Sequence, residues 1–109
     1  MPYPANQMMA DNARRALEYR RSLPPSRKFG TPVGIARARD IANKVDLSPE
    51  TILRMHSYLS RTRALFEAQD AMEPSKRGNQ WWATQLWGGK EAYAWVQDKL
   101  ERMERAGEI

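Results

Sequence analysis

The sequence predicts an all-α protein: one compact domain, residues 1–109, built as a bundle of four to five short helices that contains a helix-turn-helix-like pair. Apolar residues recur every three or four positions along most of the chain, and no stretch shows the apolar–polar alternation of a half-buried strand. Prolines and glycines divide these periodic stretches from one another. The length of 109 residues and a hydrophobic share of 41% suit one small domain with a modest core.

The first helix is predicted from about residue 12 to residue 22. Asp11 is the expected N-cap, and Ala13, Ala16 and Leu17 form its apolar line. Pro24 and Pro25 end it because proline lacks a backbone donor and restricts the residue before it. We expect residues 1–10 to form a flexible N-terminal segment.

Two longer helices are predicted next, over residues 33–45 and from Pro49 to about Ala71. The inward positions of the first are Ile35, Ala38, Ile41, Ala42 and Val45. Those of the second are Ile52, Met55, Leu59 and Phe66, whose helical spacing places them on one amphipathic face.

The last third of the chain predicts two more helices. Residues 72–79 form an internal loop with Pro74 and Gly78 as breakers. An aromatic helix over residues 81–87 follows and stops at Gly88 and Gly89, which let the chain turn directly into the next element. The final helix runs from Lys90 to about Arg105, with Ala92, Trp95, Val96, Leu100 and Met103 at helical spacing.

Residues 36–58 carry the apolar spacing of a helix-turn-helix. Small Ala42 occupies the expected crossing point of the two helices, and Leu47 fills the corner. Asp46 stands in the turn, where it tolerates a left-handed backbone better than most residues. Ser48 is a natural N-cap and Pro49 fits the first helical position. Helical pairs of this kind also serve as plain core packing.

The charge is unevenly distributed. Residues 1–63 carry a net charge of +7, whereas residues 64–109 carry −2, so the chain as a whole is at +5. The basic excess coincides with the helix-turn-helix pattern, which favours a polyanionic partner, most simply nucleic acid.

Nine basic residues are therefore candidates for DNA contact: Arg14, Arg15, Arg20, Arg21, Arg27, Lys28, Arg37, Arg39 and Arg54. Sequence readout by the third helix has weak support. Only Arg54 could contact a guanine bidentately, and Glu50 would repel phosphate unless it accepted from a cytosine amine. The alternative interpretation of these arginines is a solvated surface without a ligand.

The tryptophans are expected mainly in the core, since Trp82, Trp87 and Trp95 stand, together with Leu86, at spacings that suit helix–helix packing. Trp81 neighbours Trp82 and must face elsewhere. We therefore predict Trp81, together with Lys90 at the start of the last helix, as a contact for a protein partner.

Catalysis has little support in the sequence, and we expect no enzyme and no cofactor. There is no cysteine and only one histidine, His56, so a thiolate or histidine metal site is not expected. Gly88, Gly89 and Lys90 lack the rest of a phosphate-loop pattern. No apolar run reaches the ~20 residues of a membrane span, and the first residues do not read as a secretion signal.

Two blocks of sequence, TPVGIARARDIANKVDLSPETILRMHSYLSR and PSKRGNQWWATQLWGGKEAYAW, together resemble a small domain that recurs in tailed-bacteriophage proteins. That domain occurs alone or attached to head-assembly proteins such as prohead proteases. The double glycine after Trp87 is the more distinctive part of the match. The chain departs from the family at Thr62, Arg63 and Lys90, where His, Glu and Asp are usual, so no role tied to those residue types carries over.

The leading hypothesis from the sequence is a non-enzymatic bacteriophage protein that binds DNA largely non-specifically through its basic helix-turn-helix-like surface. The alternative is a structural or assembly protein of the virion head that docks on a capsid, portal or protease partner. A third hypothesis joins them, because a packaging component can bind DNA and assemble into a homo-oligomer. The expected location is the host cytoplasm or the virion.

Overall fold

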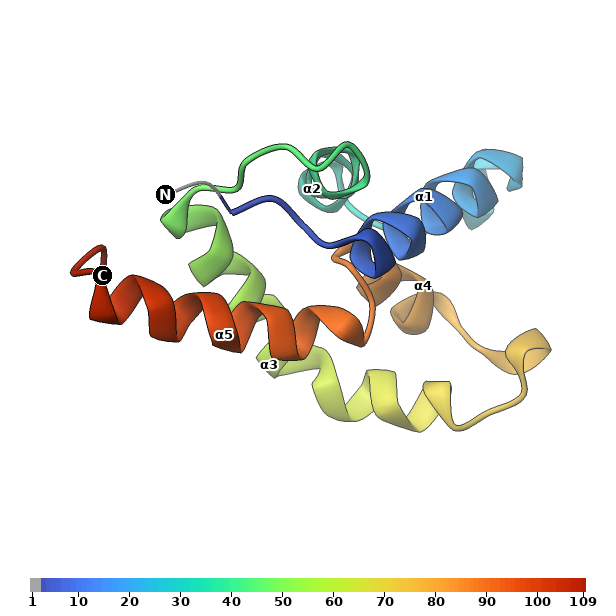
Figure 1. The fold of residues 1–109 in the computed structure, drawn as a ribbon. Coiled ribbons are helices and arrows are strands. Elements are labelled where there is room, and N and C mark those ends of the chain that lie inside the picture. The colour runs from blue at the N-terminus through green and yellow to red at the C-terminus, as the bar shows by residue number, and fades with distance from the viewer. Residues whose placement is uncertain (1–2) are drawn as a thin grey trace.

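The computed structural model describes residues 3–109 and confirms the all-α fold (Figure 1). No strand occurs between residues 3 and 109. The third and last helices lie within one residue of the bounds that the sequence predicts. The elements are, in chain order, α1 (Gln7–Ser22), η1 (Pro25–Arg27), α2 (Pro32–Ala42), α3 (Pro49–Asp70), η2 (Pro74–Lys76), α4 (Asn79–Leu86) and α5 (Glu91–Arg105), of which η1 and η2 are single 3₁₀ turns.

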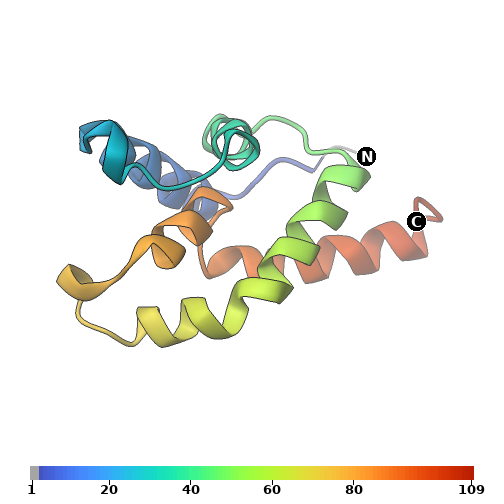
Figure 2. The ribbon, with the colours of Figure 1, turned by 180° about the vertical axis from the view of Figure 1, so that it is seen from behind.

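The helices form two packed pairs that the short helix α4 joins. α1 lies against α2, and α3 lies against α5, while α4 contacts α1, α2 and α3 (Figures 1 and 2). Because α4 touches both pairs, its buried residues belong to the centre of the fold. Leu86 is fully buried there, and the next residue, Trp87, stacks on Tyr58 of α3 with 4.6 Å between ring centroids.

The predicted core positions of α3 are confirmed, because Ile52, Met55, Leu59 and Phe66 are all at most 2% exposed. Trp87 and Trp95 are also buried, as predicted. Trp82 is only half-buried and packs against the edge of the core. Its ring stacks on Tyr19 of α1 at 4.3 Å between centroids, and Tyr19 is itself 40% exposed.

The prediction for the N-terminal segment is wrong for residues 3–10; residues 1 and 2 of that segment lie outside the described residues. α1 begins at Gln7 rather than near residue 12, since the Asn6 side chain accepts from the Met9 amide at 2.9 Å and acts as the N-cap in place of Asp11. Tyr3 is buried, its carbonyl accepts from the Leu47 amide, and its hydroxyl donates to Glu108. Burial of apolar side chains fixes this segment, and no local pattern in the sequence signals those distant partners.

The end of α2 also differs from the prediction. The helix stops at Ala42, and Lys44, not Asp46, takes the left-handed conformation with φ +52°. The Val45 amide donates to the Asp40 carbonyl and the Lys44 amide to that of Ile41, which is the hydrogen-bond pattern of a Schellman motif. Val45 therefore points outward and is 46% exposed. Glycine is usual at this position, so a lysine gives no sequence signal for the stop.

The helix-turn-helix-like pair is present as two consecutive helices but does not pack as predicted. α2 rests on α1 and α4 instead of on α3, and in both ribbon views α2 is seen along its axis while α3 runs across the picture (Figures 1 and 2). Ala42 faces α1 rather than a crossing with α3. The local predictions at the start of α3 are confirmed: Leu47 is buried, Ser48 is the N-cap and Pro49 is the first helical residue.

The turn from α4 to α5 depends on two left-handed glycines, Gly88 (φ +107°) and Gly89 (φ +72°). The buried side chain of Asn12, on α1, lies against this turn. Its amide nitrogen donates to the Gly88 carbonyl at 2.9 Å and to the Glu91 carboxylate. A Cβ at Gly89 would lie only 2.5 Å from Asn12 Nδ2 and from Gln85 Oε1. The double glycine is thus explained by close packing.

Gly89→Ala is expected to lower the free energy of unfolding by about 3 kcal/mol or more, since it adds a clash and disturbs a buried hydrogen bond on top of the left-handed strain. Gly107→Ala is the matched control: its φ is +75°, and nothing lies within 4 Å of a Cβ built there. It carries the strain alone, about 1 kcal/mol. Urea denaturation of both variants measures the difference; equal losses would contradict the packing role of Gly89.

Candidate nucleic-acid interface

Five of the nine predicted DNA-contact residues line one groove between α1 and α2, which we call the basic groove. They are Arg14, Arg20, Arg21, Lys28 and Arg39. The groove has a volume of about 410 Å³, and Glu18 is the one carboxylate in its lining. Its remaining lining residues are Leu17, Ile35, Ala42 and Asn43. The structure thus gathers cations that are up to 25 residues apart in the sequence.

Helical geometry selects which arginines reach the groove. Arg14 and Arg21 are seven residues apart on α1, so they lie on the same face of that helix. On α2, Arg37 and Arg39 are two residues apart, which is a rotation of about 200° around the helix axis, so they lie on nearly opposite faces. Arg39 therefore lines the groove, and Arg37 lies on the other side of α2.

The loop between α1 and α2 adds Lys28 to the groove and is fixed by two cations. The Lys28 ammonium donates to the Arg20 carbonyl at 2.7 Å and to the Arg21 carbonyl at 3.4 Å, so it caps the C-terminal end of α1. Arg20 Nε donates in return to the Phe29 carbonyl at 2.6 Å. These contacts set the shape of this end of the groove as well as its charge.

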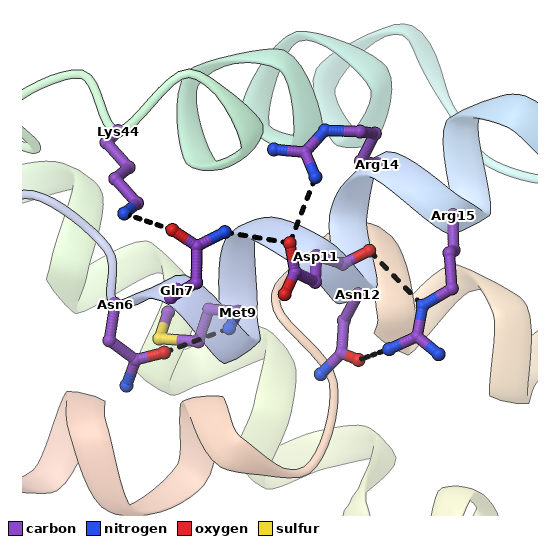
Figure 3. Close-up of polar contacts among 8 residues, drawn as sticks. All are labelled: Asn6, Gln7, Met9, Asp11, Asn12, Arg14, Arg15 and Lys44. Atoms are coloured by element: carbon purple, nitrogen blue, oxygen red, sulfur yellow. Dashed lines mark hydrogen bonds and ion pairs between the residues drawn. The ribbon is translucent and has the colours of Figure 1, made fainter.

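Carboxylate pairing divides the groove's cations into two kinds. Arg14 pairs with Asp11 at 2.9 Å, and Asp11 also accepts from Gln7, which in turn accepts from Lys44 (Figure 3). The hydrogen bond from Gln7 and the neighbouring Arg14 lower the pKa of Asp11. Within residues 3–109, the other four cations of the groove have no carboxylate partner; they are Arg20, Arg21, Lys28 and Arg39.

The other four predicted DNA-contact residues lie outside the basic groove. Arg15 points to another face of α1 and donates to Asn12 (Figure 3). Arg27 is exposed in η1. The side chain of Arg37 is only 14% exposed and pairs with Asp40 at 3.3 Å, so it is less accessible than a DNA contact requires. Arg54, on α3, pairs with Glu50 at 2.8 Å on the exposed start of that helix.

The two predicted partner contacts differ in exposure. Trp81 was expected to be exposed but is half-buried: its indole N–H donates to Asp70 at 2.9 Å, and its ring stacks on Phe66. Arg77 covers the ring at 4.7 Å from its centroid. The sequence gives no signal for this burial, because the three residues that cover Trp81 all lie outside α4: Phe66, Asp70 and Arg77. Lys90 is exposed at the start of α5.

A cleft between α3 and α5, with a volume of about 550 Å³, is lined by charged groups of both signs. His56 lines it together with Arg63, Glu67, Asp70 and Lys90. Burial raises the pKa of Tyr93, beside Arg63, to about 12. The described residues contain no group of three or more histidine, aspartate or glutamate side chains that could hold a metal ion.

No family model, curated protein or solved structure matches this chain. Among the described helices, none combines the length and the apolar character that crossing a membrane requires.

Lys28→Met is expected to destabilise the fold by about 1 kcal/mol, because it leaves two carbonyls at the end of α1 without their cap. Arg27→Met removes the same charge from an exposed neighbour whose side chain has no polar contact within residues 3–109, and it should change stability little. Thermal unfolding of both variants, followed by circular dichroism, separates the two effects. A loss shared equally by the two variants would contradict the capping role.

Proposed function

We propose that this chain is a non-enzymatic protein that binds duplex DNA through the phosphate backbone, without marked sequence preference, and that the basic groove is its main contact. The observation that carries the proposal is the gathering of four cations without carboxylate partners, Arg20, Arg21, Lys28 and Arg39, around one groove. A concave, positively charged surface attracts the phosphates of a nucleic acid and releases its condensed counterions.

Guanidinium groups suit this role because their planar set of donors matches two phosphate oxygens at once. Arg21 and Arg39 are both exposed and face the groove from opposite helices, so they can contact phosphates on either side of it. Arg14 adds less net charge, since Asp11 neutralises it. Backbone contacts of this kind position a protein on DNA but carry no sequence information.

The start of α3 offers little for reading bases, which supports non-specific over specific binding. Arg54 is the one residue there that suits a bidentate guanine contact, and its guanidinium pairs with Glu50. The helix also lies outside the pair that forms the basic groove. A recognition helix is therefore not part of the proposal.

The biological setting of the proposal rests on sequence alone. The resemblance of the TPVGIARARDIAN and QLWGG blocks to a tailed-phage domain makes a bacteriophage the expected source. The host cytoplasm or the virion is then the expected location.

Replacing Arg21 and Arg39 together with glutamine should weaken binding to a random-sequence duplex and flatten its salt dependence. Each lost phosphate contact lowers the log–log salt slope by about 0.9 on B-form DNA, so the double variant should lose about 1.8. Fluorescence anisotropy across a salt titration gives both the affinity and the slope.

The matched control is Lys76→Gln with Arg105→Gln, which removes the same charge from exposed residues, one in η2 and one at the end of α5. An equal loss in both double variants would show that net charge, not the basic groove, drives binding. Absence of binding by the unmodified chain at low salt would refute the proposed function.

Arg54→Ala is expected to leave affinity for random duplex within about twofold of the unmodified protein, because Glu50 neutralises Arg54 and the pair is exposed. Selection of preferred sites from a randomised duplex library checks the same point and should yield no consensus. A clear consensus that disappears in Arg54→Ala would instead indicate readout by α3.

A further inference from the structure

A second groove lies on the other side of α2, bounded by α2, α3 and α4, and its chemistry differs from that of the basic groove. We call it the apolar groove; its volume is about 440 Å³. Its apolar lining consists mainly of Val33, Gly34, Tyr58, Ala83, Leu86 and Trp87. Two cations of α3, Arg54 and Arg61, stand in the same lining, and no carboxylate does.

The indole N–H of Trp87 gives this groove a hydrogen-bond donor that has no acceptor within residues 3–109. The indole N–H of Trp81 donates to Asp70, whereas that of Trp87 contacts no acceptor within residues 3–109. Trp87 is 8% exposed, and solvent reaches its indole nitrogen. The stack on Tyr58 holds the ring in place. A fixed donor beside apolar surface suits a ligand that offers an oxygen acceptor next to an apolar side chain.

The charges of the groove define the ligand further. Arg61 donates only to the Ser57 carbonyl, at 3.4 Å, and has no carboxylate partner in the described part of the chain. Arg54 pairs with Glu50 at 2.8 Å, so it contributes less net charge to the groove than Arg61 does. Val33, in the apolar part of the lining, is 56% exposed. An anionic partner would complement the arginines, and apolar side chains would cover the rest.

We propose that the apolar groove docks an acidic amphipathic helix of a partner protein, with an apolar side chain over Tyr58 and Trp87 and a carboxylate at Arg61, the cation of this lining that has no carboxylate partner within residues 3–109. Amphipathic helices commonly bind grooves of this kind through anchors on one face. A nucleic acid is the poorer fit, because most of the lining is apolar and only two cations stand in it. This proposal concerns a different surface from the basic groove and stands independently of DNA binding.

The test uses the whole chain and a capped helical peptide with leucines along one face and glutamates elsewhere. In a proton–nitrogen correlation spectrum, the indole signal of Trp87 should shift during titration, while that of Trp81 should stay in place. A peptide with lysine for every glutamate should bind at least about tenfold more weakly.

Two variants locate the contact without unfolding the protein. A Cβ at Gly34 would lie 3.5 Å from the Trp87 indole nitrogen and 4.0 Å from Leu86, which is ordinary contact, so Gly34→Ala fits and covers the free donor. It should keep the melting temperature and lose peptide affinity several-fold. Arg54→Glu with Arg61→Glu should abolish binding, whereas Lys76→Glu with Arg105→Glu should not.

Three results would overturn the proposal: no shift of the Trp87 signal, equal binding of the acidic and basic peptides, or unchanged peptide affinity in Gly34→Ala. A short duplex DNA that shifts the Trp87 signal and loses this effect in the Arg54 and Arg61 variant would assign the groove to nucleic acid instead. DNA binding that fails while the acidic peptide still binds would refute only the proposed function.

Discussion

The contact between Asn12 and the glycine turn is the interaction on which the rest of the structure depends. The buried Asn12 amide donates to the Gly88 carbonyl and to Glu91, and so joins α1 to the turn between α4 and α5. Leaving such a donor without partners would cost about 1–3 kcal/mol, so the pairing is specific as well as favourable. α1 provides one wall of the basic groove, and this contact places α1 against the α4–α5 turn.

The sequence predicts those features that local chemistry determines. Ser48 and Pro49 define the start of α3, and the spacing from Ile52 to Phe66 gives its buried face, because capping and periodicity act within a few residues. The start of α1 and the end of α2 could not be predicted in this way. Tyr3 is held by Leu47 and Glu108, and Lys44 adopts a conformation usually left to glycine. The start of α1 depends on contacts between distant parts of the chain, whereas the end of α2 depends on a left-handed residue that is not the usual glycine.

The candidate site shows the same division. The basic character of residues 1–63 is visible in the sequence, and five of the nine cations singled out there do share a groove. Which five depends on the packing of α1 on α2, and the sequence pattern placed α2 against α3 instead. The hydrogen bond that removes Trp81 from the exposed surface likewise comes from Asp70, on a different helix.

Pairing, more than number, determines what the arginines of this chain can do. Arg14, Arg37 and Arg54 each lie beside a carboxylate within four residues, so much of their charge is neutralised locally. Arg21, Arg39 and Arg61 form no ion pair within the described residues, and each of them lines a groove. α2 separates the two grooves, with cations around one and mainly apolar side chains along the other. Helix α2, from the basic part of the sequence, thus has surfaces of different chemistry on its two sides.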